Sequence, residues 1–212
     1  VVSPRKDSVG ERLSVFIPCD KHVWLSASCD AASVSDDDGN IEFIVDDTSL
    51  PVGTTETKHL KVDIKTLPLH NLSIPSSGID DMCDLGFLHE ASILDNLRRR
   101  FENQLPYTRS GEICIAVNPY QWLDIYSPDS MNTYSHKLRH ELAPHVFATS
   151  AQAYRSLKEN KKNQSILVSG ESGAGKTETV KIMLNMLAHV ASNATTTTPI
   201  KNEKNNTKNF SV

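Results

Sequence analysis

The sequence predicts an α/β fold preceded by a small β-barrel, and three observations lead to this prediction. The first 70 residues contain short β-rich runs separated by turn residues. From Ile79 onward, amphipathic helical patterns alternate with short apolar runs, which favours a sheet covered by helices. A glycine-rich loop joins one of these apolar runs, residues 165–169, to a long amphipathic helix.

Residues 1–70 contain three candidate strands. Val23–Leu25 and Ile41–Val45 are short β-rich runs, and His59–Ile64 alternates apolar and polar side chains. An acidic run, Asp36–Asp38, either binds a cation or is a solvated loop tip, and the loop tip is the commoner outcome. Three short strands in this length indicate a small β-barrel. Residues 71–78, rich in Pro, Ser and Gly, are then expected to form a linker.

The pattern from residue 79 to residue 117 predicts one helix and one strand. Residues 91–101 form an amphipathic helix with Leu94, Leu97 and Phe101 on its apolar face. Its triple arginine, residues 98–100, is either a phosphate or partner site or, more often, a solvated helix side. Residues 111–117 are predicted to be a buried strand that ends at Asn118-Pro119, because proline cannot donate the next ladder hydrogen bond.

The remaining elements are two helices and a second strand. A helix is expected over 144–157, with Pro144 in its first turn, and a buried strand over 165–169. Residues 176–191 repeat apolar side chains at helical spacing, starting with Val180, Met183 and Leu184. Residues 192–212 are mostly Thr, Asn and Lys, so we expect a flexible polar loop there, and 79–191 is expected to be one domain.

Composition excludes several classes of function. The net charge of the 212 residues is −4, with no extended basic run, which argues against a nucleic-acid partner. The four cysteines lack the spacing of a zinc site or a disulfide framework, which indicates free thiols in a reducing compartment. His140 and His145 are poorly spaced for a metal site. No signal peptide or membrane-spanning run is visible, so we expect a cytoplasmic protein without a transmembrane segment.

The glycine-rich loop matches the pattern G-x-x-x-x-G-K-[ST] in full. This pattern, the P-loop, requires a preceding strand and a following helix, and both are predicted here. The loop therefore predicts a P-loop NTPase core that binds nucleotide phosphates, and the loop alone does not indicate which NTPase it belongs to. The residues expected to contact the nucleotide are Gly170, Glu171, Ser172, Gly173, Ala174, Gly175, Lys176 and Thr177.

The chemistry of phosphate explains the fixed positions of this loop. Glycines let the backbone wrap closely, so that successive N–H groups converge on a phosphate. The helix that follows adds its unsatisfied N–H groups and the positive end of its dipole. Lys176 supplies a full positive charge to the β- and γ-phosphates, and Thr177 offers a hydroxyl ligand to Mg²⁺.

Residues beside the loop resemble one family. Residues 163–179 closely resemble the P-loop region of myosin heavy chains, and 118–126 is similar to the myosin segment N-P-x-x-x-x-x-x-Y that lines the adenine. By that resemblance Asn118, Pro119 and Tyr126 would contact the base. From the residues alone, Tyr126 either contacts the adenine or is a buried structural tyrosine. Segments around residues 80–101 and 144–155 also look like the myosin head.

The resemblance implies an actin-based motor ATPase of the cytoskeleton, with light chains or calmodulin as possible further partners. Residues 1–70 would be the SH3-like barrel that precedes many myosin heads. The switch I pattern N-x-x-S-S-R-F-G and the switch II pattern D-I-x-G-F-E do not occur in these residues. The central sheet is therefore expected to be incomplete and the isolated chain inactive as an ATPase. The alternatives are a truncated, non-catalytic nucleotide-binding fragment or another P-loop enzyme such as a kinase.

Overall fold

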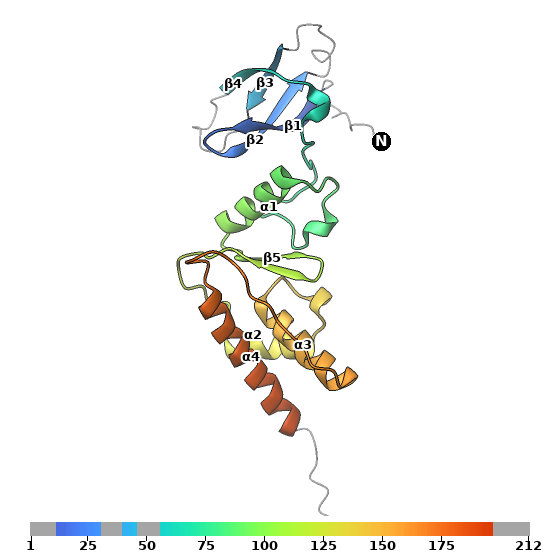
Figure 1. Ribbon diagram of the computed structural model, residues 1–212, viewed down its shortest axis with the longest axis vertical. Coiled ribbons are helices and arrows are strands. Elements are labelled where there is room, and N and C mark those ends of the chain that lie inside the picture. The colour runs from blue at the N-terminus through green and yellow to red at the C-terminus, as the bar shows by residue number, and fades with distance from the viewer. Residues whose placement is uncertain (1–11, 31–39, 46–55, 197–212) are drawn as a thin grey trace, which may run out of the picture. The chain divides into compact units, whose positions relative to one another are not determined.

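The computed structural model describes residues 12–30, 40–45 and 56–196, which fall into two compact units (Figure 1). The units divide between Val117 and Asn118. The first contains the strands β1 to β6 and helix α1, and the second contains helices α2 to α4. The predicted acidic loop at 36–38 and the polar segment from residue 197 onward lie outside the described residues.

The first unit begins with a four-stranded antiparallel sheet of order β1-β2-β3-β4. Its strands are Arg12–Cys19 (β1), Val23–Asp30 (β2), Asn40–Val45 (β3) and Glu56–Lys61 (β4). After a short 3₁₀ turn at Ile64–Thr66, the chain returns to the other edge of β1. There Phe16 N donates to Pro68 O and His70 N donates to Ser14 O. Strand β1 is thus hydrogen-bonded along both edges.

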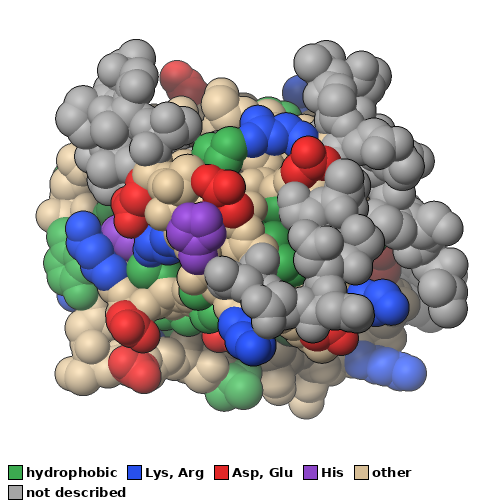
Figure 2. Space-filling model, turned by 90° about the horizontal axis from the view of Figure 1, so that it is seen from above, with side chains coloured by type: hydrophobic (Ala, Val, Ile, Leu, Met, Phe, Trp, Pro, Cys, Tyr) green, Lys and Arg blue, Asp and Glu red, His purple; other side chains and the backbone are tan. Residues whose placement is uncertain are grey.

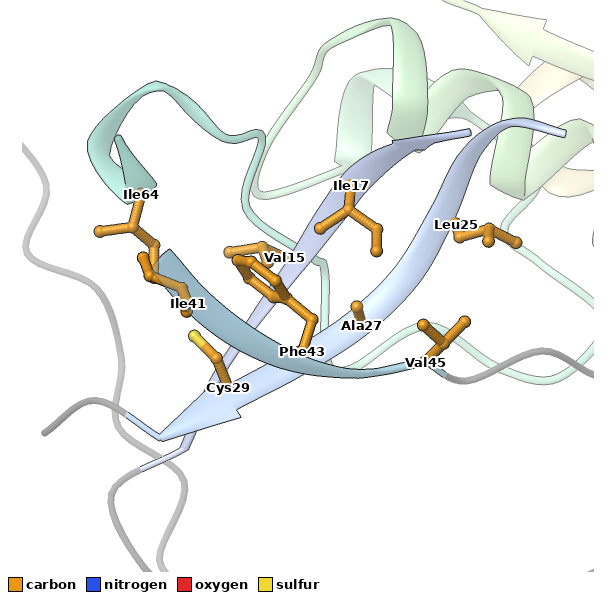
Figure 3. Close-up of a cluster of buried hydrophobic side chains, with 9 residues drawn as sticks. All are labelled: Val15, Ile17, Leu25, Ala27, Cys29, Ile41, Phe43, Val45 and Ile64. Atoms are coloured by element: carbon orange, nitrogen blue, oxygen red, sulfur yellow. The ribbon is translucent and has the colours of Figure 1, made fainter. Parts of the chain in front are cut away.

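The core of this sheet is a cluster of alternating side chains on one face (Figure 3). Because successive side chains of a strand point to opposite faces, a strand with one buried face shows this period of two. Full burial of one such aliphatic or aromatic side chain stabilises the fold by about 1.5–3 kcal/mol. The buried members are Val15, Ile17, Leu25, Ala27, Cys29, Ile41, Phe43, Val45 and Ile64.

The three predicted strands are confirmed, with shifted ends. The first extends to Asp30, and the last lies at Glu56–Lys61, so that Ile64 falls in the 3₁₀ turn. Strand β1 was not predicted, although Leu13, Val15 and Ile17 alternate along it. The likeness of this sheet to an SH3-like barrel remains a prediction.

Residues 71–78, predicted to be a linker, contain no helix or strand. They are hydrogen-bonded to the segment that follows. The Asn71 side chain accepts from Phe87 N at 2.8 Å and donates to Phe87 O at 2.9 Å. Gly78 has φ +76°, and a Cβ there would lie 2.6 Å from Asn96 Oδ1. Within the first unit, Asn71 thus joins this segment to the residues just before α1, and Gly78 lies against α1 itself.

Helix α1, Glu90–Glu102, is confirmed, but the prediction of its buried face was wrong. Leu94 and Phe101 are exposed, whereas Ser92, Asn96 and Arg100 are buried. The reason is that the buried polar side chains of this face bond to backbone groups of neighbouring segments. Asn96 Oδ1 accepts from Ile79 N, and Arg100 donates through Nε and Nη2 to the carbonyl of Tyr107. A buried polar group is tolerated when it is hydrogen-bonded in this way.

The triple arginine belongs to this network. Arg98 and Arg99 both pair with Asp95, and the buried Arg100 pairs with Asp80 at 2.8 Å. The structure therefore gives these three arginines structural partners within the first unit. The expectation that this part of the helix is solvated was wrong for Arg100. Its side chain is buried, and its guanidinium donates a hydrogen bond to Tyr107 O.

The first unit ends with a two-stranded ribbon, Tyr107–Ser110 (β5) and Ile113–Ala116 (β6). Strand β5 was not predicted. The predicted strand at 111–117 exists as β6, but its predicted burial was wrong, since Ile113 is 66% exposed. A two-stranded ribbon has too few neighbours to bury both of its faces.

The second unit is helical in its described residues. It contains Pro128–His136 (α2), which was not predicted, Val146–Asn160 (α3) and Lys176–Thr196 (α4). Helices α3 and α4 pack side by side (Figure 1). Their buried side chains include Phe147, Ala151, Met183 and Met186.

Helix α4 differs from the prediction at its end and on its surface. It continues to Thr196, whereas helix was expected only to residue 191 and a flexible loop from 192. Met183 is buried as expected, but Val180 and Leu184 are 41% and 59% exposed. The apolar side chains of α4 extend around more than one face of the helix, and among the described residues of the second unit the face with Met183 and Met186 is the buried one.

The predicted buried strand at 165–169 was wrong. Residues 161–170 form neither helix nor strand, and Leu167 is 91% exposed. A strand requires a hydrogen-bonded neighbour, and the described part of the second unit contains no strand. The chain has the mixed helix and strand content that was predicted, but both sheets of the described residues are antiparallel.

Acidic and basic side chains are interspersed on the face shown in Figure 2. None of the four cysteines is in a disulfide within the described residues, and burial raises the pKa of the Cys29 thiol. The described residues contain no cluster of three or more His, Cys, Asp or Glu side chains that could hold a metal ion. No helix among them is long and apolar enough to cross a membrane.

Candidate nucleotide-binding site

The glycine-rich loop, residues 170–175, leads directly into helix α4. Gly173 and Gly175 have φ of +82° and +90°, a left-handed conformation that side chains strongly disfavour. Thr179 N donates to Gly175 O at 2.9 Å, so the first turn of α4 closes on the last glycine of the loop. Gly170, Glu171, Ser172 and Gly173 are exposed, and Ala174 and Gly175 are half-buried. The loop is therefore a tight, solvent-accessible turn at a helix N-terminus.

Lys176 folds back over this loop. Its Nζ donates to Gly170 O and to Glu171 O, both at 2.8 Å. A single ammonium group thus spans the first two residues of the loop from the first residue of α4. This places a full positive charge beside the helix N-terminus, where an anion is also attracted by the backbone N–H groups and the helix dipole.

Thr177 is exposed in the first turn of α4, next to Lys176. A hydroxyl there is accessible to a ligand at the loop. Lys181, one turn further along, pairs at 2.6 Å with Glu178 and is well exposed. Of these two lysines of α4, Lys176 contacts the loop and Lys181 pairs along the helix surface.

The structure brings Asn118 to the loop. Its Nδ2 donates to Gly173 O at 2.9 Å, and its Oδ1 accepts from Tyr120 N at 3.0 Å. Two segments that were singled out separately in the sequence are therefore in contact. Pro119 follows as a half-buried residue, and Tyr120 takes a left-handed φ of +51°.

Tyr126 lies in an aromatic cluster at the other end of this segment. Its ring is 5.2 Å from that of Trp122, 5.4 Å from that of His145 and 6.1 Å from that of Phe147, measured between centroids. Such pairs contribute about 0.5–1.5 kcal/mol beyond area burial. Tyr126 therefore has a packing role, and its contact with the adenine remains a prediction.

His145 contacts the rings of this cluster and is also the N-cap residue of helix α3. Its Nδ1 accepts from Phe147 N at 3.0 Å and so caps the helix, and the residue is 5% exposed. Burial lowers the pKa of His145 to about 4, although a hydrogen bond with the Ile125 backbone acts in the opposite direction. The imidazole is thus neutral at pH 7. From the sequence, His145 was considered only as a metal ligand and Pro144 was expected in the first turn of the helix. Helix α3 instead begins at Val146 with His145 as its cap, so Pro144 precedes the helix.

The G-x-x-x-x-G-K-T sequence and the long helix that follows it match the P-loop class, although residues 165–169, expected to be the strand before the loop, form no strand. The particular family follows from comparison with known proteins. The family described as myosin head (motor domain) matches residues 79–209, more than half of the chain. The chain therefore belongs to the myosin motor-domain family.

Individual relatives agree with this assignment. Unconventional myosin heavy chain 6 of Caenorhabditis elegans is 45% identical over 132 residues, which is 62% of this chain and 6% of that protein. Myosin-11 of Arabidopsis thaliana is 41% identical over 176 residues, which is 82% of this chain and 11% of that protein. The chain thus spans only a small part of the length of these two relatives.

Proposed function

We propose that residues 170–177 bind the phosphates of ATP. The observation that carries the proposal is the loop itself, which combines left-handed Gly173 and Gly175, the helix N-terminus and the Lys176 ammonium in one turn. Each of these features favours a bound anion, and together they match the requirements of a nucleotide phosphate. Pro119 and Tyr126 are proposed to lie at the adenine, and Asn118, expected there by resemblance, contacts the loop itself through Gly173 O.

The loop also suits Mg²⁺ as the companion of the nucleotide. Thr177, exposed at the helix start, would hold the ion, because a hydroxyl oxygen is a hard ligand of the kind Mg²⁺ prefers. When bound, Mg²⁺ neutralises negative charge on the β- and γ-phosphates. The residues of this chain contribute the fixed donors and the lysine charge that position the same phosphates.

In the whole protein we propose that this site serves an actin-based motor ATPase of the cytoplasm and cytoskeleton. Membership of the myosin motor-domain family supports this function over a small-molecule kinase. Actin filaments, and light chains or calmodulin, are the proposed partners of the whole protein. The 212 residues contain neither switch pattern, so we propose that this chain alone binds nucleotide weakly and does not hydrolyse it.

Calorimetric titration of the 212-residue chain with Mg·ADP tests the proposed site. Lys176→Ala should weaken binding by about 10- to 100-fold, because a hydrogen bond to a charged group contributes about 1.5–3 kcal/mol. Lys181→Ala is the matched control, since it removes a lysine from the same helix that pairs only with Glu178 among the described contacts. Equal affinity of the wild type and Lys176→Ala would refute the assignment of the site.

A further inference from the structure

We infer that Asn118 is a positioning residue for the phosphate loop, which it holds through the Gly173 carbonyl. This inference deepens the proposed function and rests on it. It differs from the role expected by resemblance, in which Asn118 contacts the adenine. The distinction matters because a positioning residue of the loop would affect every phosphate ligand, whether or not the ligand carries a base.

The hydrogen bonds of Asn118 show how the residue is used. Its Nδ2 donates to Gly173 O at 2.9 Å across 55 positions of sequence, and its Oδ1 accepts from Tyr120 N at 3.0 Å. The amide nitrogen thus hydrogen-bonds to the loop, and the amide oxygen hydrogen-bonds to the turn that follows Asn118. Both ends of the side chain are engaged with protein groups.

The loop backbone at Gly173 and Gly175 lies close to Asn118 and Tyr120. A Cβ on Gly173 would lie 3.8 Å from the hydroxyl of Tyr120, and a Cβ on Gly175 would lie 3.9 Å from Asn118 Nδ2. Both distances are ordinary van der Waals contact. Residues 118–120 therefore lie directly against the loop at two of its three glycines.

The bond to Gly173 O orients a peptide plane of the loop. In a trans peptide the C=O and N–H groups point in opposite directions, so fixing Gly173 C=O toward Asn118 turns the Ala174 N–H the other way. That N–H points toward the start of the loop, where it donates to Glu171 O over a long 3.3 Å. A phosphate oxygen could replace so weak a contact, since N–H···O bonds are usually near 2.9–3.0 Å.

Asn118 thus contributes to phosphate binding indirectly, because it orients the Ala174 N–H. Loss of its side chain would let the 173–174 peptide rotate and misdirect the Ala174 N–H. A typical hydrogen bond contributes about 0.5–1.5 kcal/mol, which corresponds to a loss of about 2- to 10-fold in affinity.

The test compares Mg·ADP with Mg·pyrophosphate, which has no base, in calorimetric titrations of the 212-residue chain. In Asn118→Ala both affinities should fall by the same factor of about 2- to 10-fold. Asn132→Ala is the matched control. It deletes a hydrogen bond of similar length, to His189 Nε2 at 2.9 Å, that joins α2 to α4 in the same unit. Weaker Mg·ADP binding with unchanged Mg·pyrophosphate binding would overturn the inference in favour of a base contact.

A second readout needs no ligand. Amide hydrogen exchange at Ala174 should be about 2- to 10-fold faster in Asn118→Ala than in the wild type and unchanged in Asn132→Ala. If the wild type binds neither probe, the proposed function fails and exchange alone decides the role of Asn118. Faster exchange then supports the positioning role, and unchanged exchange overturns it.

Discussion

Replacing His145 should remove a dependence of stability on pH between about 4 and 6.5. His145 is buried, caps helix α3 and has its pKa lowered to about 4 from 6.5. Between these values the unfolded chain binds a proton at this imidazole and the folded chain does not. Stability from this group is therefore fully present above about pH 6.5 and is lost as pH falls toward 4.

The size of this effect follows from the pKa difference. One pH unit corresponds to about 1.4 kcal/mol, so the free energy of unfolding should fall by about 2–3 kcal/mol from about pH 7 to about pH 4.5. His145→Asn keeps an acceptor for Phe147 N, because asparagine is a good N-cap, but it does not titrate. The variant should lose stability through its smaller side chain by an amount that does not vary with pH.

Urea denaturation followed by the fluorescence of Trp122 provides the assay. Trp122 lies in the aromatic cluster, 5.2 Å from the ring of Tyr126, and Trp24→Phe removes the one other tryptophan of the chain. The difference in unfolding free energy between the wild type and His145→Asn should shrink by about 2–3 kcal/mol on acidification. An unchanged difference across this range would refute the role given to burial of the imidazole.

Three further predictions concern packing and turnover. Gly78→Ala should lower the unfolding free energy of the first unit by about 1–3 kcal/mol, because φ is +76° and the new Cβ would lie 2.6 Å from Asn96 Oδ1. Gly86→Ala, whose Cβ would meet its nearest atom at 3.4 Å, should be nearly neutral in the same denaturation experiment, and equal losses would contradict the steric argument. Ser150→Ala should raise thermal stability by about 0.5–1.5 kcal/mol, since its buried hydroxyl has no partner among the described residues, and a lower melting temperature would be evidence against that reason. Purified 1–212 should release phosphate from Mg·ATP no faster than Lys176→Ala, with or without actin filaments, and clear turnover above that variant would count against the need for the switch patterns.

Helices were predicted better than the faces they bury. Periodicity located α1, α3 and α4, because a repeat near 3.6 residues survives any tertiary arrangement. It failed on α1, where hydrogen-bonded Asn96 and Arg100 occupy the buried face and Leu94 is exposed. Hydropathy alone cannot foresee backbone partners such as Ile79 N and Tyr107 O.

Strands were predicted less well, because a strand depends on a neighbour. Ile41–Val45 forms a strand beside β2 and β4, whereas 165–169 has an equally apolar pattern and no neighbouring strand among the described residues of its unit. Strand β1 was missed although Leu13, Val15 and Ile17 alternate along it with the period of a strand.

The glycine-rich loop and the helix after it could be predicted from sequence, because phosphate chemistry fixes residue types at fixed spacing, but the strand expected before the loop is not formed at 165–169. The contact between Asn118 and Gly173 could not be predicted, since nothing in either segment specifies a hydrogen bond across 55 residues. The structural role of His145 could likewise not be predicted from its residue type. Its capping bond and its burial depend on how residues 118–126 pack against α3.

Nucleotide-induced changes in the backbone amide resonances of the 212-residue chain test the central claim most directly. On addition of Mg·ADP, the amides of residues 170–177 should shift most, followed by those of 118–126, and the sheet residues 12–30 and 56–61 should stay unchanged. The same titration of Lys176→Ala should give little or no shift. Shifts confined to residues outside 170–177, or equal shifts in the wild type and Lys176→Ala, would contradict binding at this loop.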